Sequence, residues 1–297
     1  MLVASRTPGA DDFGVDVIEQ RPSRRRWIAG VVIALAVAVP IGGVLFSRNT
    51  RAPEPEPEPT PLPEVSALPP AANMVHPAET GDEVRTIKVV FPDGSRARVS
   101  YPADLRLAEL GLRPYATVLM GTAFRELIAP YQGAAEVAAG GPMIRRLTPQ
   151  VTLWPRQVGG GGQILLYGFD DWQITLRDQP MPLTFEDRIT LAESVHGEVT
   201  PEGFLTFRTD PPVELMKPGR ILAGQPVGPQ LWIGGGIGPL VALTPLPDCG
   251  PDSRVPPAVT RRSGAFGTTC GNGYQVSASG RRDFVERALA TIKIRAE

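Results

Sequence analysis

The most constraining feature of this chain is an uncharged run of 20 residues, from Trp27 to Phe46. A helix rises about 1.5 Å per residue, so a helix of this length crosses the ~30 Å hydrocarbon core of a bilayer. The run therefore predicts a single transmembrane helix over residues 27–46. Pro40 removes one helical hydrogen bond near the end of the run, and membrane helices tolerate such a loss.

The arginines around this run predict its orientation. Arg21 and the three arginines at positions 24–26 precede it, whereas Arg48 and Arg51 follow it. Because the side richer in positive charge stays in the cytoplasm, residues 1–26 are predicted to form a cytoplasmic tail. A cleaved signal peptide is the alternative, but its apolar part usually has about 7–15 residues and ends in a small-x-small site. The longer run here favours a retained signal-anchor.

A proline-rich segment follows the predicted helix. Proline occupies every second position from Pro53 to Pro63, and Glu54, Glu56 and Glu58 lie between these prolines. Proline fixes its own φ and pushes the preceding residue towards extended conformations, which favours polyproline II. Residues 47–82 are therefore predicted to be an extended Pro/Glu-rich linker. A docking site for a proline-recognising module is the alternative interpretation of this segment.

Residues 83–297 are predicted to form an extracytoplasmic, mainly β domain, either all-β or α+β, with antiparallel sheets in a sandwich-like arrangement. The length of this segment is compatible with either one domain or two. Two hairpins are predicted, at Val84–Tyr101 around Asp93 and Gly94 and at residues 163–177, because apolar and polar residues alternate on both sides of a turn. Further strands are expected near residues 115–120, 147–153, 185–194, 203–208, 230–234, 240–243 and 273–278.

Helices are expected to be few. The clearest lies at residues 281–292, where apolar residues at 284, 285, 288, 289 and 292 form one helical stripe. Ser279 is expected to cap this helix, and Lys293–Arg295 is expected to form a short terminal strand. Leu105–Leu110 predicts one or two helical turns, and residues 122–131 are compatible with either a helix or a strand.

Cys249 and Cys270, the only cysteines, both lie in a loop-rich stretch of the predicted outer domain. The compartment outside a bacterial inner membrane is oxidising, so the pair predicts one disulfide. A reactive thiol and a metal pair are the alternatives, but no histidine lies near either cysteine.

The composition limits the possible chemistry. A formal net charge of −1 argues against nucleic-acid binding, which usually needs a basic surface. With two histidines and two cysteines, we predict no metal site, no cofactor and no catalytic residue. His196, between Glu193 and Glu198, is the candidate general base if the chain is an enzyme, although a turn histidine is the favoured interpretation. The neighbouring acids Asp170 and Asp171 favour a turn over a glycosidase pair.

Two glycine-rich stretches resemble phosphate-binding loops only superficially. Gly159–Gly162 lacks the lysine that a phosphate loop needs, so it predicts a hairpin tip. In residues 232–240, Pro239 stands where a dinucleotide fingerprint needs glycine, and a bulge or close backbone contact explains these glycines better. Trp154, Trp172 and Trp232 could contribute to a glycan-binding platform, but filling the core is the favoured role.

These patterns support a functional hypothesis with two alternatives. The leading hypothesis is a single-pass cell-membrane protein whose outer domain is non-enzymatic and binds another envelope protein or a cell-wall component. Its helix would contact the lipid bilayer, with the N-terminus in the cytoplasm. The first alternative is an envelope hydrolase with His196 as its acid/base. The second is a single-span sensor that couples the outer domain to a cytoplasmic partner through residues 1–26.

Overall fold

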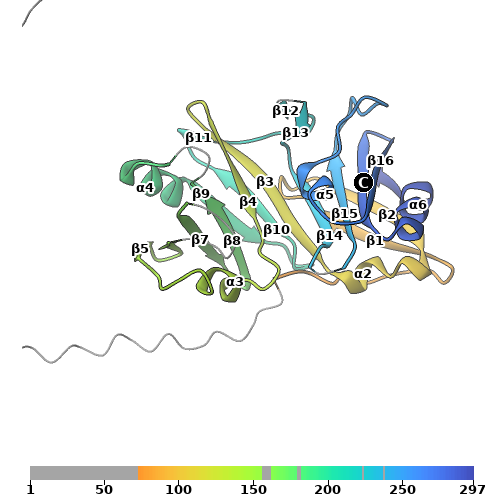
Figure 1. Ribbon diagram of the computed structural model, residues 1–297, viewed down its shortest axis with the longest axis horizontal. Helices are drawn as coiled ribbons and strands as arrows, with labels where there is room; N and C mark the ends of the chain where they lie inside the picture. The colour runs from red at the N-terminus through yellow and green to blue at the C-terminus, as the bar shows by residue number, and fades with distance from the viewer. Residues whose placement is uncertain (1–72, 156–161, 179–181, 223, 237) are drawn as a thin grey trace, which may run out of the picture. The chain divides into compact units, whose positions relative to one another are not determined.

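The computed structural model describes residues 73–155, 162–178, 182–222, 224–236 and 238–297 (Figure 1). The chain divides into two units, Met1–Val65 and Ser66–Glu297, and every described residue belongs to the second unit. The predicted tail, the predicted transmembrane helix at 27–46 and the linker up to residue 72 lie outside the described residues. Within the described ranges, no helix is long and apolar enough to cross a membrane.

The described unit is mainly β, with antiparallel sheets and a C-terminal helix, as predicted. Its strands are β1 (Val84–Val90), β2 (Arg96–Pro102), β3 (Leu112–Met120), β4 (Ala123–Ile128), β5 (Arg145–Thr148), β6 (Val151–Trp154), β7 (Ile164–Phe169), β8 (Trp172–Arg177), β9 (Val195–Val199), β10 (Leu205–Thr209), β11 (Val213–Leu215), β12 (Ile221–Leu222), β13 (Gln225–Pro226), β14 (Gln230–Gly234), β15 (Leu240–Pro245), β16 (Ala265–Gly271), β17 (Tyr274–Gly280) and β18 (Lys293–Ala296). Its helices are the 3-10 helix η1 (Ala103–Leu105), α2 (Leu107–Leu110), α3 (Ala134–Ala138), α4 (Phe185–Ser194), α5 (Pro257–Thr260) and α6 (Arg282–Thr291).

One large sheet organises the unit. It has 11 strands, ten of them in the order β16-β17-β15-β14-β3-β4-β8-β7-β6-β5, while β11 pairs with β3. A separate three-stranded sheet has the order β1-β2-β18, and β9-β10 and β12-β13 form two-stranded ribbons. Figure 1 shows the long strands β3 and β4 in the middle of the molecule, with β7 and β8 on one side and β14 and β15 on the other. The large sheet thus connects the two ends of the unit.

Two apolar clusters form the core. Alternate side chains of a strand point to opposite faces of its sheet, so each strand contributes every second residue. In the first cluster, Ile87 and Val99 of the three-stranded sheet pack with Val241 and Val276 of the large sheet. Side chains of α6, such as Val285, complete this cluster.

The second cluster lies at the other end of the large sheet. Leu165 of β7 and Ile174 of β8 pack there with Leu191 of α4 and Phe207 of β10. Strand β3 contributes to both clusters, with Leu112 in the first and Val118 in the second. Both cores are therefore built on one continuous sheet.

Most of the predicted local structure is confirmed. The two predicted hairpins are β1–β2 and β7–β8, and β18 follows α6 as expected. The ambiguous segment at 122–131 contains β4. The predicted cap of α6 is wrong, because the N-cap is Arg281 and no side chain caps the helix. Ser279 belongs instead to β17, where it pairs with Leu240 and Phe266 of the neighbouring strands.

The strand predicted at residues 185–194 is also wrong, because this segment is the helix α4. Thr184 accepts a hydrogen bond from the amide of Asp187, and the Asp187 carboxylate accepts one from the amide of Thr184, at 3.1 Å each. This capping box satisfies two amides that the first turn leaves without helical partners. The cap makes a helix favourable despite the apolar–polar alternation that predicts a strand.

Candidate functional site

The second face of the large sheet is polar although much of it is buried. Arg113 and Thr117 of β3, Thr175 of β8, Gln230 of β14 and Gln275 of β17 are each at most 6% exposed. Backbone carbonyls supply hydrogen-bond partners for several of them. The side-chain amides of Gln230 and Gln275 donate to the carbonyls of Pro226 in β13 and of Arg254 in the loop before α5. Buried polar groups need such partners, and the segments that cover this face provide them.

Two adjoining cavities, of about 260 Å³ and 150 Å³, open on this polar face. Both are lined by Ile128, Arg177, Trp232 and Ala258, so they form one hollow that we call the Trp232 groove. Its floor is β3, β4, β8 and β14, and its walls come from α5, the segment 129–136 and Gly235. The other lining residues are Arg113, Tyr115, Glu126, Ala129, Pro130, Tyr131, Glu136, Thr175, Gln225, Pro226, Val227, Gln230, Gly235, Leu240, Pro256, Pro257, Arg261 and Arg262.

Aromatic side chains give the Trp232 groove its apolar surface. Trp232 is half-buried and stacks on Tyr115, with ring centroids 4.8 Å apart and an angle of 17° between the rings. Its indole nitrogen donates to Gln230 at 3.0 Å. Tyr131 stands at the rim and is 41% exposed, and its ring lies over the guanidinium of Arg113. These contacts hold the rings in fixed positions, which lowers the entropy cost of binding a ligand against them.

Arg113 is a buried cation beneath this surface. It is 6% exposed, and its guanidinium donates to the carbonyls of Ala129 and Gly234 at 2.8 Å each. The pKa of Arg113 is lowered to about 10, mainly by burial and to a smaller extent by the charge of Arg262, while Glu136 and Tyr131 act in the opposite direction. The guanidinium remains charged at neutral pH, and no described carboxylate forms an ion pair with it.

Arg262 holds the glycine-rich loop that forms one wall. Its guanidinium donates to the carbonyls of Gly235, Gly236 and Gly238 at 2.7–2.9 Å. A Cβ on Gly236 would lie 2.8 Å from the ring of Tyr131, which would have to move, and a Cβ on Gly234 would lie 2.5 Å from the backbone carbonyl oxygen of Pro239. The close backbone contact predicted for this stretch is confirmed. A guanidinium has five donors in a rigid plane, which suits it to gathering several carbonyls.

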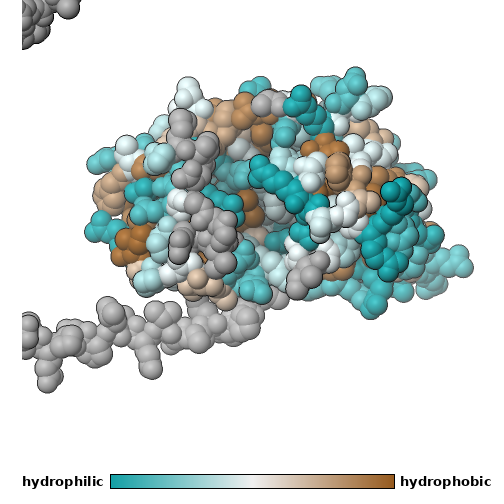
Figure 2. All heavy atoms as spheres, viewed as in Figure 1, coloured by the Kyte–Doolittle hydropathy of each residue, from teal (hydrophilic) through white to brown (hydrophobic). Residues whose placement is uncertain are grey.

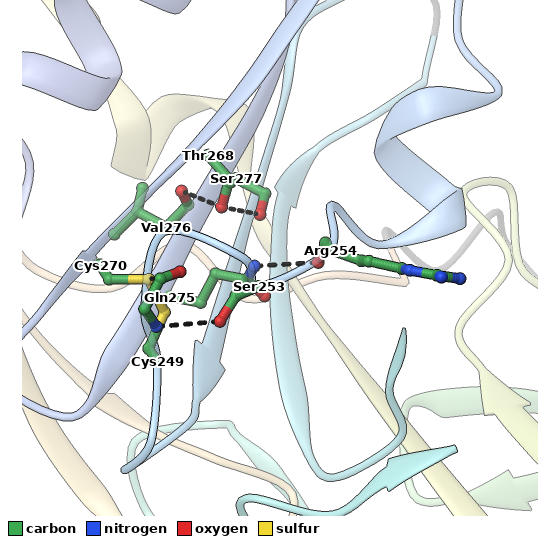
Figure 3. The surroundings of a disulfide bond; sticks show 9 residues. Cys249, Ser253, Arg254, Thr268, Cys270, Gln275, Val276 and Ser277 are labelled. Carbon is green, nitrogen blue, oxygen red and sulfur yellow. Dashed lines mark hydrogen bonds between the residues drawn. A yellow bond between two sulfur atoms is a disulfide. The ribbon is translucent and has the colours of Figure 1, made fainter. Parts of the chain in front are cut away.

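A disulfide between Cys249 and Cys270 anchors the segment that carries α5, as predicted. It joins the loop after β15 to the edge strand β16, with the Cα atoms 5.5 Å apart (Figure 3). The amide of Gln275 also donates to the carbonyl of Arg254 at 3.0 Å in the same loop. These two links position the segment that ends in Arg261 and Arg262 at the Trp232 groove.

His196 lies elsewhere in the fold, on the ribbon of β9 and β10. Its Nε2 is 2.8 Å from a carboxylate oxygen of Asp210, which is 61% exposed, whereas the sequence placed Glu193 and Glu198 nearby. His196 lines none of the five cavities described by the structure. The pair is a surface contact, and Asp210 is the side-chain partner of the imidazole among the described residues.

The other residues singled out by sequence are dispersed. Asp170 and Asp171 form the turn between β7 and β8, as predicted. Trp172 is buried in the second core cluster, Trp154 packs on a small satellite cluster, and Trp232 lies in the groove. Gly159–Gly161 lie outside the described residues. Within the described ranges, no three His, Cys, Asp or Glu side chains are grouped to hold a metal ion.

Sequence reasoning missed most of the Trp232 groove. Tyr131, Arg113 and Arg262 come from three separate segments, and only the fold brings them together. The available signal was the polar side of the apolar strand β3, where Arg113, Tyr115 and Thr117 alternate. No family model, no curated protein and no solved structure matches this chain.

Proposed function

We propose that this chain is a membrane-anchored extracytoplasmic binding protein of the cell envelope, and that its Trp232 groove binds another envelope protein or a wall component. The uncharged run at 27–46 and its flanking arginines support the anchor and its orientation. The proline-alternating segment at 53–63 supports a spacer, and the disulfide is in keeping with an oxidising compartment.

The observation that carries the binding role is the composition of the groove. Tryptophan, tyrosine and arginine dominate the residues that contribute most to protein interfaces, and these residues cluster in pockets. Trp232, Tyr115 and Tyr131 meet several arginines in this one hollow. Figure 2 shows small hydrophobic areas separated by hydrophilic residues on the visible face, which fits a local binding site better than a broad apolar interface.

Photocrosslinking in cells tests the binding role. A photoreactive residue at position 258, which lines the groove, is expected to give a defined adduct with an envelope component. Position 286, exposed on α6 and outside the described cavities, is the matched control and is expected to give none. No adduct at position 258, or equal adducts at both positions, would contradict the proposal.

Protease treatment of intact spheroplasts tests the topology. Protease is expected to degrade the portion of the chain after residue 47 and to spare the N-terminal tail. An uncut outer portion, or a full-length soluble species after fractionation, would contradict the anchor.

An envelope hydrolase is the second candidate function, and the contact between His196 and Asp210 is the observation that favours it. A carboxylate can orient an imidazole for general base work. His196→Gln is expected to abolish hydrolysis of an envelope substrate if this candidate is correct, and to leave groove adducts unchanged if the binding proposal is correct.

A further inference from the structure

We propose that the Trp232 groove recognises an acidic, extended segment of a partner protein, an inference that rests on the proposed binding function. The first argument is charge. Among the described residues, three arginines line the larger cavity, Arg113, Arg177 and Arg262, together with one carboxylate, that of Glu136. Arg177 and Arg261 line the smaller cavity against Glu126. Arginine exceeds acid in both cavities, although the whole chain carries a formal charge of −1.

The positive surface continues beyond the groove. A third cavity, of about 740 Å³, is lined by Arg261, Arg262 and Arg281, and none of its described lining residues is acidic. It shares Arg262 with the larger cavity of the groove and Arg261 with the smaller one. Asp283 pairs with Arg281, so Arg261 and Arg262 carry most of the excess charge here. The Trp232 groove and this third cavity together have room for several consecutive acidic residues.

The acids at the groove offset only part of this excess, because each cavity has one described carboxylate and at least two arginines. The carboxylate of Glu126 accepts a hydrogen bond from Tyr115 at 3.0 Å, and Glu136 lies near enough to Arg113 to raise its pKa. Arg113 and Arg262 donate to backbone carbonyls, and neither forms an ion pair with a described carboxylate. Carbonyl dipoles stabilise these cations without neutralising them, so the field in the groove favours an anion.

Arg261 is the side chain best placed to contact that anion. It is exposed, it lines two of the three cavities, and its guanidinium makes no ion pair or hydrogen bond with the described residues. The planar fork of a guanidinium can bind a carboxylate through two hydrogen bonds. Arg261 therefore offers donors to a ligand, whereas Arg262 and Arg113 shape the wall behind it.

The position of the groove favours a peptide that binds through its side chains. It does not favour a peptide that pairs with the sheet as an added strand. The Trp232 groove lies over the central strands β3, β4, β8 and β14, away from the edge strands β5 and β16. Strand addition needs a free sheet edge, so backbone pairing is not available there. Clusters of arginine recognise acidic motifs, and Trp232 and Tyr131 offer apolar contact to residues between the acids.

Binding of a labelled oligoglutamate peptide to the full-length chain in non-ionic detergent tests this inference. Fluorescence anisotropy is expected to show saturable binding that weakens as salt rises, because salt screens exposed charges. An oligoglutamine peptide of the same length is expected not to bind. Arg261→Gln is expected to weaken binding, and Arg261→Glu is expected to weaken it about five- to tenfold.

The matched control is Arg295→Glu, an equal charge reversal at an exposed arginine on β18 of the other sheet. It is expected to leave the affinity unchanged. Equal weakening by both reversals, or no binding of oligoglutamate at low salt, would overturn the inference. Binding of oligogalacturonate but not of oligoglutamate would instead identify an acidic glycan and would also overturn it. A photoadduct at position 258 in cells, without oligoglutamate binding, would leave the binding function standing while this inference fails.

Discussion

At the residue scale, the arginines of the polar face organise the backbone. Arg113 and Arg262 together donate to the carbonyls of five residues, and four of these are the glycines at positions 234, 235, 236 and 238. A lysine ammonium could not gather the same set, because it is a compact charge without a planar fork. Sequence alone could not assign this role, since the arginines are 149 positions apart (262 − 113) and their partners are backbone atoms.

Asn73 provides a prediction at this scale. Its amide group donates to the carbonyls of Pro130 and Gln173 at 2.6 Å and 2.8 Å, and its carbonyl accepts from the Gln173 amide at 2.9 Å. Asn73→Ala would leave these groups without partners, so we expect a loss of about 2–4 kcal/mol in the free energy of unfolding, measured with urea.

Gln132→Ala is the control for Asn73, since the Gln132 side chain is exposed. It is expected to change the free energy of unfolding by less than about 0.5 kcal/mol. Equal losses for the two variants would contradict the role of Asn73.

Glu202 provides a pH prediction. The Arg96 guanidinium, 2.9 Å away, lowers the pKa of the Glu202 carboxyl to about 2, with help from hydrogen bonds to backbone and to Thr200. The folded pKa lies below the ordinary value of 4.5, so this stabilisation is present above about pH 4.5 and is lost as the pH falls towards 2. In a carboxyl-detected NMR titration, Arg96→Gln is expected to return the pKa of Glu202 towards 4.5. An unchanged pKa in this variant would exclude Arg96 as the cause.

At the scale of elements, local patterns predicted what local interactions determine. The hairpins β1–β2 and β7–β8 were predictable because their turns and alternation lie within about 20 residues of each other. Helix α4 was not, because the capping box of Thr184 and Asp187 outweighed a strand-like pattern. The order of strands in the large sheet depends on contacts between distant segments, so it could not be predicted, and neither could the groove over its centre.

The Cys249–Cys270 disulfide provides a prediction at this scale. It closes a loop over a sequence separation of 21, and the chain-entropy relation gives a stabilisation of about 3 kcal/mol for such a loop. The double variant Cys249→Ala, Cys270→Ala is expected to lose about this free energy of unfolding in urea. Adding reductant is expected to lower the free energy of unfolding of the wild-type chain by the same amount as the double substitution does. It is expected to leave the free energy of unfolding of the variant unchanged. If reductant does not change the stability of the wild-type chain, the disulfide does not have this stabilising role.

At the scale of the whole described unit, two cores share one sheet. Strand β3 contributes to both clusters, and Val75 packs against both. The same hydrogen-bonded strands contribute side chains to both cores. We therefore expect that loss of one core disturbs the other. The sequence did not decide whether residues 83–297 form one domain or two, because length and alternation do not show which strands are neighbours.

Matched core variants test this coupling. Ile87 and Ile174 are both 0% exposed, one in each cluster. Ile87→Ala and Ile174→Ala are each expected to cost about 2–5 kcal/mol through lost burial and a residual cavity. Both variants are expected to shift one cooperative transition, seen alike by tryptophan fluorescence and circular dichroism. Separate transitions by the two probes would indicate independent cores.

The pairing of β18 with β2 has a consequence for biogenesis. Ile294 lies opposite Val99, and Arg295 lies opposite Arg98, so β18 completes a sheet whose other two strands lie about 200 residues earlier in the chain. A growing polypeptide emerges from its amino end first, and distant contacts form late. The first hydrophobic cluster therefore stays incomplete until β18, at Lys293–Ala296, has emerged from the ribosome. A variant that lacks β18 should leave this cluster exposed, and chaperones and proteases should recognise it.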